Sequence, residues 1–289
     1  MKILIFYSGG KDSQACLIHS INKYGVENCE AVFCDTGWEN PLTYDHIVNT
    51  TNMMGVKLVI LKSKKYDGML DLAKKKKRFP STKARFCTEE LKSKPAIDYV
   101  LSHTENLIVI EGIRASESFS RSKMQAQCTY FKYYFEAGLN GKTHTYRKKD
   151  IVAWCKKYNA DKIRPLFDWS SQQVIDYIIS YGQTPNPLYY LGFKRVGCFP
   201  CIMCTHSEFK LIIDNHKDRL AIIEKAEIEL KSSLFKPDYI PKRFCTGFSK
   251  GKKYPMLKDV VKYLSDKNAT MDIFEEETVS CMSVYNLCE

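Results

Sequence analysis

The feature that most constrains the fold is the stretch YSGGKDSQAC at residues 7–16, which follows an apolar run at residues 3–6. The run is short, β-branched and aromatic, as in a buried strand, and the residues after Lys11 have helical spacing. The two glycines therefore lie at a strand-to-helix turn, which predicts an anion-binding loop of backbone N–H groups at a helix N-terminus. Ile5 stands where a Walker loop needs glycine, and the adjacent glycines do not fit G-x-G-x-x-G.

Strand-like runs alternate with helical patterns through the first part of the chain. The runs lie at residues 3–6, 31–34, 56–61, 107–111 and 163–166. This alternation predicts an α/β fold with a Rossmann-like parallel five-stranded sheet and helices on both faces. Ser170 and Gln173 form a capping box at the start of one predicted helix, and Gly182 follows its end.

The alternation breaks near residue 185, where TPNPLYYLGFKRVGCFPCIMC brings prolines, glycines and cysteines together. We therefore predict an α/β domain over residues 1–185 and a smaller, mainly helical, cysteine-bearing region without strands over residues 186–289. Ligands of a parallel sheet bind beyond the carboxyl ends of its strands. The segments expected to converge there are residues 8–13, 35–38, 112–114 and the surroundings of Asp168.

Charge and hydropathy narrow the class of partner. A formal net charge of +11 favours nucleic acid, although nucleotide phosphates alone account for part of it. The basic run at residues 74–78 is typical of a solvated face, with nucleic-acid contact as the alternative. The sequence has no run of about 18 apolar residues, and its N-terminus enters a strand, which predicts a cytoplasmic protein without a membrane partner.

The cysteines form one informative cluster. Twelve cysteines in a reducing compartment favour metal ligation or reactive thiols over disulfides. The spacing of Cys198, Cys201 and Cys204 lets thiolates on one turn converge on a metal ion or cluster, with a redox dithiol or plain packing as alternatives. The candidates for a more distant ligand are Cys87, Cys245, Cys281 and Cys288.

The sequence Ser-Gly-Gly-Lys-Asp-Ser at residues 8–13 resembles the loop of the ATP-pyrophosphatase, or PP-loop, superfamily. The resemblance implies that residues 1–185 form a domain that binds ATP or another adenine nucleotide, transfers AMP and releases pyrophosphate. Lys11 would neutralise the leaving pyrophosphate, and Asp12 would orient a Mg²⁺-bound water or cap the helix. The implied nucleotide-binding residues of the loop are Ser8, Gly9, Gly10, Lys11, Asp12 and Ser13.

A narrower resemblance, to the phosphoadenosine phosphosulfate (PAPS) reductase family, rests on five ordered segments. They read FCDTGWENPLTYDHI, RFCTEELKSKP, EGIRASESFSR, PLFDWSSQQVIDYI and NPLYYLGFKRVGC. The resemblance implies that Asp35 and Thr36 lie at the ribose or base, and that Gly112, a catalytic Arg114 and Arg121 lie on the phosphate side. The i,i+4 spacing of Arg121 and Glu117 equally suits an ion pair that only braces a helix.

The chain also departs from that family. True sulfonucleotide reductases end in a Glu-Cys-Gly-x-His-like tail, whereas this chain ends in SCMSVYNLCE. Reductases with an iron-sulfur cluster carry an adjacent cysteine pair, whereas Cys87 is followed by Thr88. Both departures argue against reduction of adenosine phosphosulfate (APS) or PAPS.

The C-terminal sequence CMSVYNLCE resembles the ending of a phage and bacterial subgroup of this family, in which C-terminal cysteines accompany the C-x-x-C motif. The resemblance implies a [4Fe-4S] cluster. Its ligands would be Cys198, Cys201, Cys281 and Cys288, with Cys87 or Cys204 as substitutes. Zinc is the alternative, because four thiolates suit a tetrahedral zinc site equally well.

These features together predict an ATP-dependent enzyme that adenylates its substrate, either to transfer sulfur to a nucleic acid or to modify the nucleic acid in another way. The adenylated atom of DNA or tRNA would accept sulfur through the cluster or through a catalytic thiolate such as Cys87, supplied by a sulfur-donor protein. Two alternatives remain. One is an APS or PAPS reductase, and the other is a nucleotide-binding, non-catalytic subunit of a modification complex.

Overall fold

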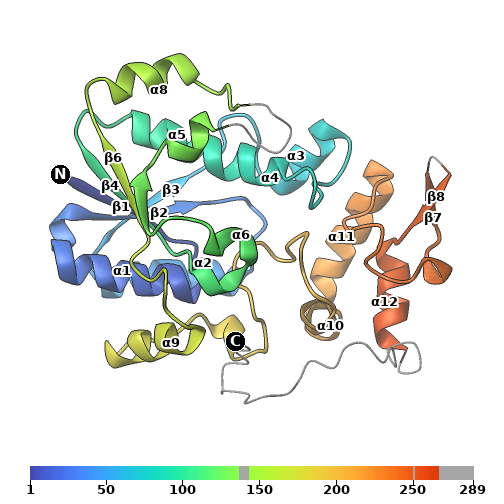
Figure 1. The fold of residues 1–289 in the computed structure, drawn as a ribbon. Helices are drawn as coiled ribbons and strands as arrows, with labels where there is room; N and C mark the ends of the chain where they lie inside the picture. The colour runs from blue at the N-terminus through green and yellow to red at the C-terminus, as the bar shows by residue number, and fades with distance from the viewer. Residues whose placement is uncertain (137–142, 250, 267–289) are drawn as a thin grey trace.

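The computed structural model describes residues 1–136, 143–249 and 251–266 (Figure 1). One six-stranded sheet forms its centre, with strand order β3-β2-β1-β4-β6-β5. All neighbours pair in parallel except β5 and β6, which are antiparallel. The strands are β1 (Lys2–Phe6), β2 (Cys29–Cys34), β3 (Lys57–Leu61), β4 (Leu107–Glu111), β5 (Gln127–Thr129) and β6 (Ala160–Ile163).

The predicted α/β, Rossmann-like fold is confirmed, but the sheet has six strands instead of five. The additional strand, β5, is a three-residue edge strand whose sequence, QCT, lacks a run of apolar residues. The last parallel strand also lies earlier than the predicted 163–166, because it ends at Ile163. Pro165 has no N–H to donate to a sheet, so the strand cannot continue through it.

Helices cover both faces of the sheet (Figure 1). Ile3 and Ile5 of β1 face one apolar cluster, whose helices are α1 (Lys11–Tyr24), α2 (Pro41–Met53) and α9 (Ser171–Ser180). Leu4 faces the other, whose helices are α5 (Lys94–Leu101), α7 (Lys132–Phe135) and α8 (Lys148–Cys155). This alternation along β1 is the period of two expected of a strand buried on both faces.

Local signals fix several helix ends. The predicted capping box is present at α9, where Ser170 and Gln173 exchange hydrogen bonds between side chain and backbone N–H. Shorter helical elements connect the sheet. They are η1 (Val26–Asn28), α3 (Met69–Lys76), α4 (Phe86–Thr88), the π-helix η2 (Glu89–Ser93), η3 (Ala115–Glu117), α6 (Phe119–Ser122) and η4 (Pro187–Tyr189). Within the described residues, we find no helix with the length and apolarity needed to cross a membrane.

The chain after residue 205 forms the part of the molecule farthest from the sheet (Figure 1). Its elements are α10 (His206–Asn215), α11 (Lys217–Leu230), η5 (Lys242–Phe244), β7 (Gly247–Ser249), β8 (Lys252–Tyr254) and α12 (Leu257–Ser265). It is mainly helical, but β7 and β8 form an antiparallel hairpin that the sequence did not predict. Strands of three residues are too short to show an apolar alternation.

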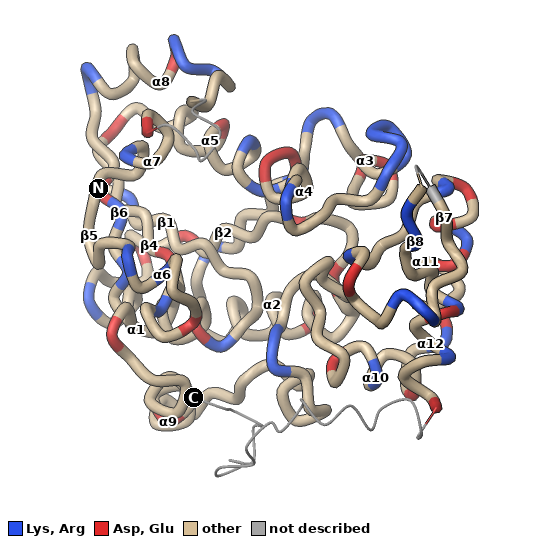
Figure 2. The backbone as a smooth tube through the Cα atoms, turned by 45° about the vertical axis from the view of Figure 1, so that its right-hand side comes forward, with Lys and Arg blue, Asp and Glu red and all other residues tan. Residues whose placement is uncertain are grey.

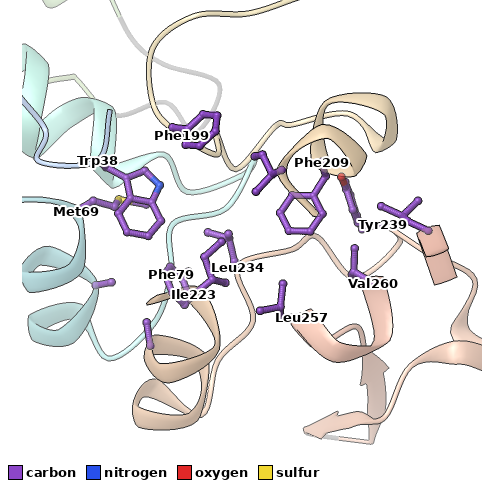
Figure 3. Packing of buried hydrophobic residues seen from close by; sticks show 14 of the residues in the cluster. Trp38, Met69, Phe79, Phe199, Phe209, Ile223, Leu234, Tyr239, Leu257 and Val260 are labelled. Atoms are coloured by element: carbon purple, nitrogen blue, oxygen red, sulfur yellow. The ribbon is translucent and has the colours of Figure 1, made fainter. Parts of the chain in front are cut away.

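A third apolar cluster joins this C-terminal part to the sheet domain (Figure 3). Trp38 and Met69, from segments that follow β2 and β3, belong to the same cluster as Phe209 of α10 and Leu257 of α12. This core contains residues from both sides of the domain division predicted near residue 185. The division itself stays a prediction.

Candidate functional site

The loop of residues 8–13 is shaped by its two glycines. Gly9 has a φ of 77°, and a Cβ added there would lie 3.0 Å from side-chain atoms of Ile47 and Thr43. Gly10 precedes α1 without a side-chain cap. Among the described residues, nothing accepts a hydrogen bond from the backbone amides of Gly9, Gly10 or Asp12. These amides and the N-terminus of α1 form a cradle that suits an anion.

The polar side chains of the loop are held close to it. Ser13 Oγ donates to Gly10 O at 2.9 Å and accepts from Ser8 N at 3.2 Å. Lys11 is 5% exposed, and its Nζ lies 3.1 Å from the carboxylate of Asp12. The one cation of the loop is therefore already beside the cradle, paired with an acidic neighbour.

Residues 184–189 hold the loop and the first turn of α1 in place through hydrogen bonds. The Lys11 backbone N–H donates to the buried hydroxyl of Tyr189 at 3.0 Å, and Asn186 Nδ2 donates to Gly9 O at 3.2 Å. Gln14 Nε2 donates to Thr184 O at 3.0 Å. The sequence did not single out Tyr189 as a site residue, because only its position in a family-like segment marked it.

Arg114 and Gly112, predicted on the phosphate side, lie directly against the loop. Arg114 is 4% exposed, and its Nε donates to Asp12 at 2.5 Å. The remaining guanidinium bonds run to Ser171 Oγ at 2.7 Å, Ser116 Oγ at 2.9 Å and Trp169 O at 3.2 Å. A Cβ on Gly112 would lie 2.7 Å from Ser13 N. The guanidinium thus ties the loop to the start of α9, and its catalytic role stays a prediction.

Arg121 forms an ion pair with Glu117, and its side chain is 36% exposed. The ion pair suggested by the i,i+4 spacing is therefore present, but it links η3 to α6 across the extended Ser118 instead of bracing one helix. The Glu117 carboxylate also accepts from the backbone N–H of Arg114, at 2.9 Å. Contact of Arg121 with a nucleotide stays a prediction.

The carboxyl end of β2 carries Asp35 and Thr36, the predicted ribose or base contacts. Asp35 accepts hydrogen bonds from Tyr44 Oη at 2.7 Å and Gly37 N at 2.8 Å. Partial burial raises the pKa of Asp35, but these bonds and the Lys62 ammonium outweigh burial and hold that pKa below its usual value. Thr36 Oγ1 donates to the buried carboxylate of Glu39 at 2.7 Å. Both side chains are therefore engaged within their own loop.

The cysteine turn lies beside this loop. Phe199 N donates to Trp38 O at 2.7 Å, and Trp38 Nε1 donates to Pro200 O at 3.0 Å. Cys198 Sγ is 3.9 Å from Thr36 Oγ1. Burial raises the pKa of the Cys198 thiol, and the nearby Lys92 ammonium opposes that rise. The structure thus brings the predicted ligand Cys198 to the end of β2, next to Thr36.

The predicted metal ligands are only partly within the described residues. Cys281 and Cys288 lie outside them. Inside the described ranges, no three His, Cys, Asp or Glu side chains are arranged to hold a metal ion. Cys87 of α4, whose pKa is raised by burial, is close enough to Cys201 for the two thiols to interact electrostatically. The four-thiolate set and its substitutes stay a prediction.

A cleft of about 1190 Å³ extends from the carboxyl ends of β1, β2 and β4. Ser8 of the loop and Gly197 of the cysteine segment both lie on its wall. Three carboxylates line it, Glu39, Glu89 and Glu111. The cations that line it are Lys76, Arg78, Lys83, Arg85, Lys92, Lys94 and Lys162, and the aromatic side chains include Phe6, Phe86, Tyr130, Phe131, Tyr133, Tyr134 and Tyr146. Figure 2 shows basic residues along α3 and the segment that follows it.

The sequence matches known proteins over most of its length. The sequence profile of the phosphoadenosine phosphosulfate reductase domain matches residues 2–204. An uncharacterized protein of Methanocaldococcus jannaschii is 27% identical over 262 residues, which are 90% of this chain and 54% of that protein. The chain covers 36% and 42% of two further curated relatives, so it spans about half of their length or less.

Two solved structures resemble the fold at low sequence identity. A PAPS reductase from Candida auris has a TM-score of 0.46 at 20% identity, covering 69% of this chain and 82% of that chain. A U34-tRNA thiolase from Methanococcus maripaludis, solved with its [4Fe-4S] cluster, has a TM-score of 0.41 at 17% identity. That likeness covers 92% of this chain and 82% of the thiolase chain.

Proposed function

The chain belongs to the phosphoadenosine phosphosulfate reductase domain family, within the PP-loop ATP pyrophosphatase superfamily, and on that premise we propose that it adenylates an acceptor with ATP. The observation that carries the proposal is the cradle at residues 8–13, where Lys11 and amides that have no acceptor among the described residues meet at the N-terminus of α1. In the proposed reaction an acceptor oxygen attacks the α-phosphorus. The bond from that phosphorus to the bridging oxygen breaks, and pyrophosphate leaves.

The loop residues would stabilise the charge that develops on the leaving pyrophosphate. The amides of Gly9 and Gly10 would donate to phosphate oxygens, and the Lys11 ammonium would turn from Asp12 toward them. Asp12 would then be free on one side to bind Mg²⁺, while Arg114 holds its other oxygen. Ser8, whose side chain is exposed beside the cradle, would add a hydroxyl donor.

The proposed second step is sulfur transfer. Sulfur at the oxidation level of hydrosulfide, delivered by a sulfur-donor protein, would displace AMP from the activated atom, so that the step needs no oxidant or reductant. Cys198 and Cys201 offer thiols at the edge of the proposed ATP site, and Cys87 is near them. With Cys281 and Cys288 they would hold a [4Fe-4S] cluster, which would supply the sulfur-carrying chemistry, or a structural zinc ion.

The proposed acceptor is a nucleic acid, DNA or tRNA. The cleft supports this choice, since its cationic side chains outnumber its carboxylates and aromatic rings line the same wall. Cations suit the phosphate backbone, and aromatic rings stack on unpaired bases. The volume of about 1190 Å³ also exceeds the range of roughly 300–1,000 Å³ that is usual for a single small ligand.

Pyrophosphate release tests the adenylation step. The full chain is incubated with ATP, Mg²⁺ and either total tRNA or single-stranded DNA, and pyrophosphate is measured. Lys11→Ala should lower the rate by about 10²–10³-fold, as expected for the loss of a group that stabilises developing charge. Lys23→Ala, at the exposed far end of the same helix, is the matched control and should retain the rate. If the wild-type chain consumes ATP without releasing pyrophosphate, the proposal is wrong.

Metal analysis tests the cluster. After anaerobic purification, about four irons and four sulfides per chain are expected, and Cys198→Ser should lower both strongly. Cys155→Ser, at an exposed cysteine of α8, should leave the iron content unchanged. One zinc ion and no iron would instead assign the thiols to a structural site and remove the cluster from the mechanism.

The family itself favours one second candidate, an APS or PAPS reductase. Sulfite release from either compound with a dithiol reductant would identify it. Cys87 is followed by Thr88 where reductases with an iron-sulfur cluster carry an adjacent cysteine pair, so we expect no sulfite. If the chain binds nucleotide but forms no product in any of these assays, the remaining candidate is a non-catalytic subunit.

A further inference from the structure

The segment from Lys242 to Lys262 carries an excess of positive charge on its surface. Asp259 is the one acidic residue of this stretch of sequence, and it is buried. Within the described residues, the cations of this segment form no ion pair. The exposed cations are Lys242, Arg243, Lys252, Lys253, Lys258 and Lys262. A cluster of unpaired cations is stable on a small element only because water and counterions screen it, and a polyanion can replace both.

The hairpin of β7 and β8 adds an aromatic ring to these cations. Phe248 is 67% exposed. Phe248 pairs with Lys253 across the hairpin, and Ser249 pairs with Lys252. Directly paired residues of antiparallel strands point to the same face, so Phe248 and Lys253 lie side by side on one face. Lys252, the neighbour of Lys253 on β8, lies on the opposite face of the hairpin. We name Phe248, Lys252 and Lys253 of the hairpin, together with Lys242 and Arg243 of the preceding element η5, the hairpin patch.

The hairpin is held in place by buried groups. Asp259 of α12 accepts hydrogen bonds from Thr246 N at 2.8 Å and from Met256 N at 2.9 Å, which clamps both ends of the hairpin to one carboxylate. The ring of Tyr254 packs so closely on Gly247 that a Cβ there would lie 2.6 Å from it. The hairpin that carries Phe248 is therefore held in one position, so less conformational entropy is lost when its ring binds a ligand.

The hairpin patch lies beyond α11 from the cleft. Figure 1 draws β7 and β8 at the end of the molecule away from the sheet, with α11 between them and the sheet domain, and Figure 2 draws β7, β8 and α11 together at that end. Lys74 of α3 joins α11 through an ion pair with Glu229 at 3.0 Å. Lys76 of α3 lines the cleft, so this helix carries basic residues both at the cleft and at its contact with α11.

We propose that the hairpin patch binds the backbone and a base of single-stranded nucleic acid outside the cleft. The cations would contact phosphates, and Phe248 would stack on an unpaired base. An exposed aromatic ring among cations favours a single strand over a duplex, because the bases of a duplex are already stacked on one another. The inference deepens the proposed function, on which it rests, by naming a second contact surface for the acceptor.

Salt-dependent binding tests the inference. The full chain is titrated with fluorescent single-stranded DNA and RNA of about 20 nucleotides, longer than the roughly 4–16 that one compact fold covers. Fluorescence anisotropy gives Kd at several salt concentrations. Changing both lysines, Lys252→Gln with Lys253→Gln, should lower the slope of log K against log salt by about 1.4, since each phosphate contact in a single strand contributes roughly 0.7.

Two further variants separate the parts of the patch. Phe248→Ala should weaken binding by about 5- to 100-fold without changing the salt slope, because base stacking involves no counterion. The pair Lys156→Gln with Lys157→Gln, exposed at the end of α8, removes the same charge elsewhere and should leave the slope unchanged. Thermal unfolding of each variant checks that the hairpin substitutions leave the fold intact.

The outcomes are distinguishable. Wild-type affinity and slope in the hairpin variants would overturn the inference and leave the proposed adenylation of nucleic acid standing. Equal losses in the hairpin and α8 lysine pairs would reduce the patch to a general charge effect. No binding of either strand by the wild-type chain would overturn the nucleic-acid acceptor, and the hairpin surface with it.

Discussion

Tyr189 occupies one of the amides that the start of α1 would otherwise offer to an anion. Its hydroxyl accepts from Lys11 N at 3.0 Å, and a Cβ on Gly10 would lie 3.4 Å from the same oxygen. The hydroxyl proton is not needed for that bond, so it is available to a phosphate oxygen placed in the cradle. A residue far along the chain thereby helps to set the position of the loop.

We expect Tyr189→Phe to separate binding from folding. The free energy of unfolding should fall by about 1 kcal/mol, because a buried amide loses its acceptor. The KM for ATP in pyrophosphate release should rise several-fold, with a smaller change in kcat, since the hydroxyl positions the loop without reacting. Tyr181→Phe, at a half-exposed tyrosine at the end of α9, should change neither value. An unchanged KM in Tyr189→Phe would restrict the hydroxyl to a structural role.

His46 on α2 gives the protein a specific pH dependence. Burial lowers the pKa of His46 to about 4, and its Nε2 lies 3.2 Å from Gln14 Oε1. An unfolded histidine has a pKa of about 6.5, so below pH 6.5 the unfolded chain takes up a proton that the folded chain refuses. The contribution of His46 to stability is therefore present above pH 6.5 and is lost as the pH falls toward 4.

Between pH 7.5 and 5.0 this group should cost about 2 kcal/mol of unfolding free energy. Urea denaturation at the two pH values measures that difference in the wild type and in His46→Gln. The variant should be less stable at pH 7.5 and should show a pH difference smaller by about 2 kcal/mol. Parallel pH curves for the two chains would show that His46 is protonated in the fold.

At the scale of single elements, the end of β4 and the start of α1 touch through backbone. The strand ends at Glu111, and the next residue, Gly112, faces Ser13 N so closely that a Cβ would lie 2.7 Å from it. No flexible side chain can move aside at this contact, because the neighbouring atoms belong to the backbone of α1. The absence of a side chain at one position thus sets how closely the sheet approaches the loop.

Gly112→Ala should therefore push β4 and α1 apart. We expect a loss of about 1–3 kcal/mol in unfolding free energy, as for other overpacked sites, and weaker binding of ATP. Gly10→Ala is a useful comparison, since its φ is −86° and its added Cβ would meet the Tyr189 oxygen at an ordinary 3.4 Å. Its melting temperature should stay closer to that of the wild type. Equal melting temperatures in all three chains would show that α1 moves without cost.

At the scale of the whole molecule, the sequence was sufficient for the sheet and for the position of the loop. Apolar runs alternating with helical patterns predict parallel strands, and the glycine pair behind the first run predicts the turn before α1. The order of the segments also anticipated that residues near Arg114 and Asp168 approach the loop, as the bonds from Arg114 to Asp12 and Trp169 O demonstrate.

The rest depends on contacts that no local pattern records. Tyr189 meets Lys11 across 178 positions of the chain. The Glu39 carboxylate accepts three hydrogen bonds from its own loop and one from Tyr44 of α2. Strands of three residues, such as β5 and β7, are stabilised by their neighbours, and their own sequences are too short to show a period. The tail cysteines Cys281 and Cys288 lie outside the described residues, so their predicted role is unchanged.

The paired hydrogen bonds between Trp38 and the turn at Phe199 and Pro200 have a mechanical consequence. Trp38 O accepts one of these bonds and Trp38 Nε1 donates the other, so a single residue holds the turn that bears Cys198 against the loop that follows β2. In the proposed reaction, the distance from that thiol to the adenylated acceptor would therefore be set by the scaffold before any reactant binds. Inserting one residue into the turn at Phe199 and Pro200 would leave the chemistry of every side chain unaltered and would still change that distance, so the two proposed steps would no longer be aligned.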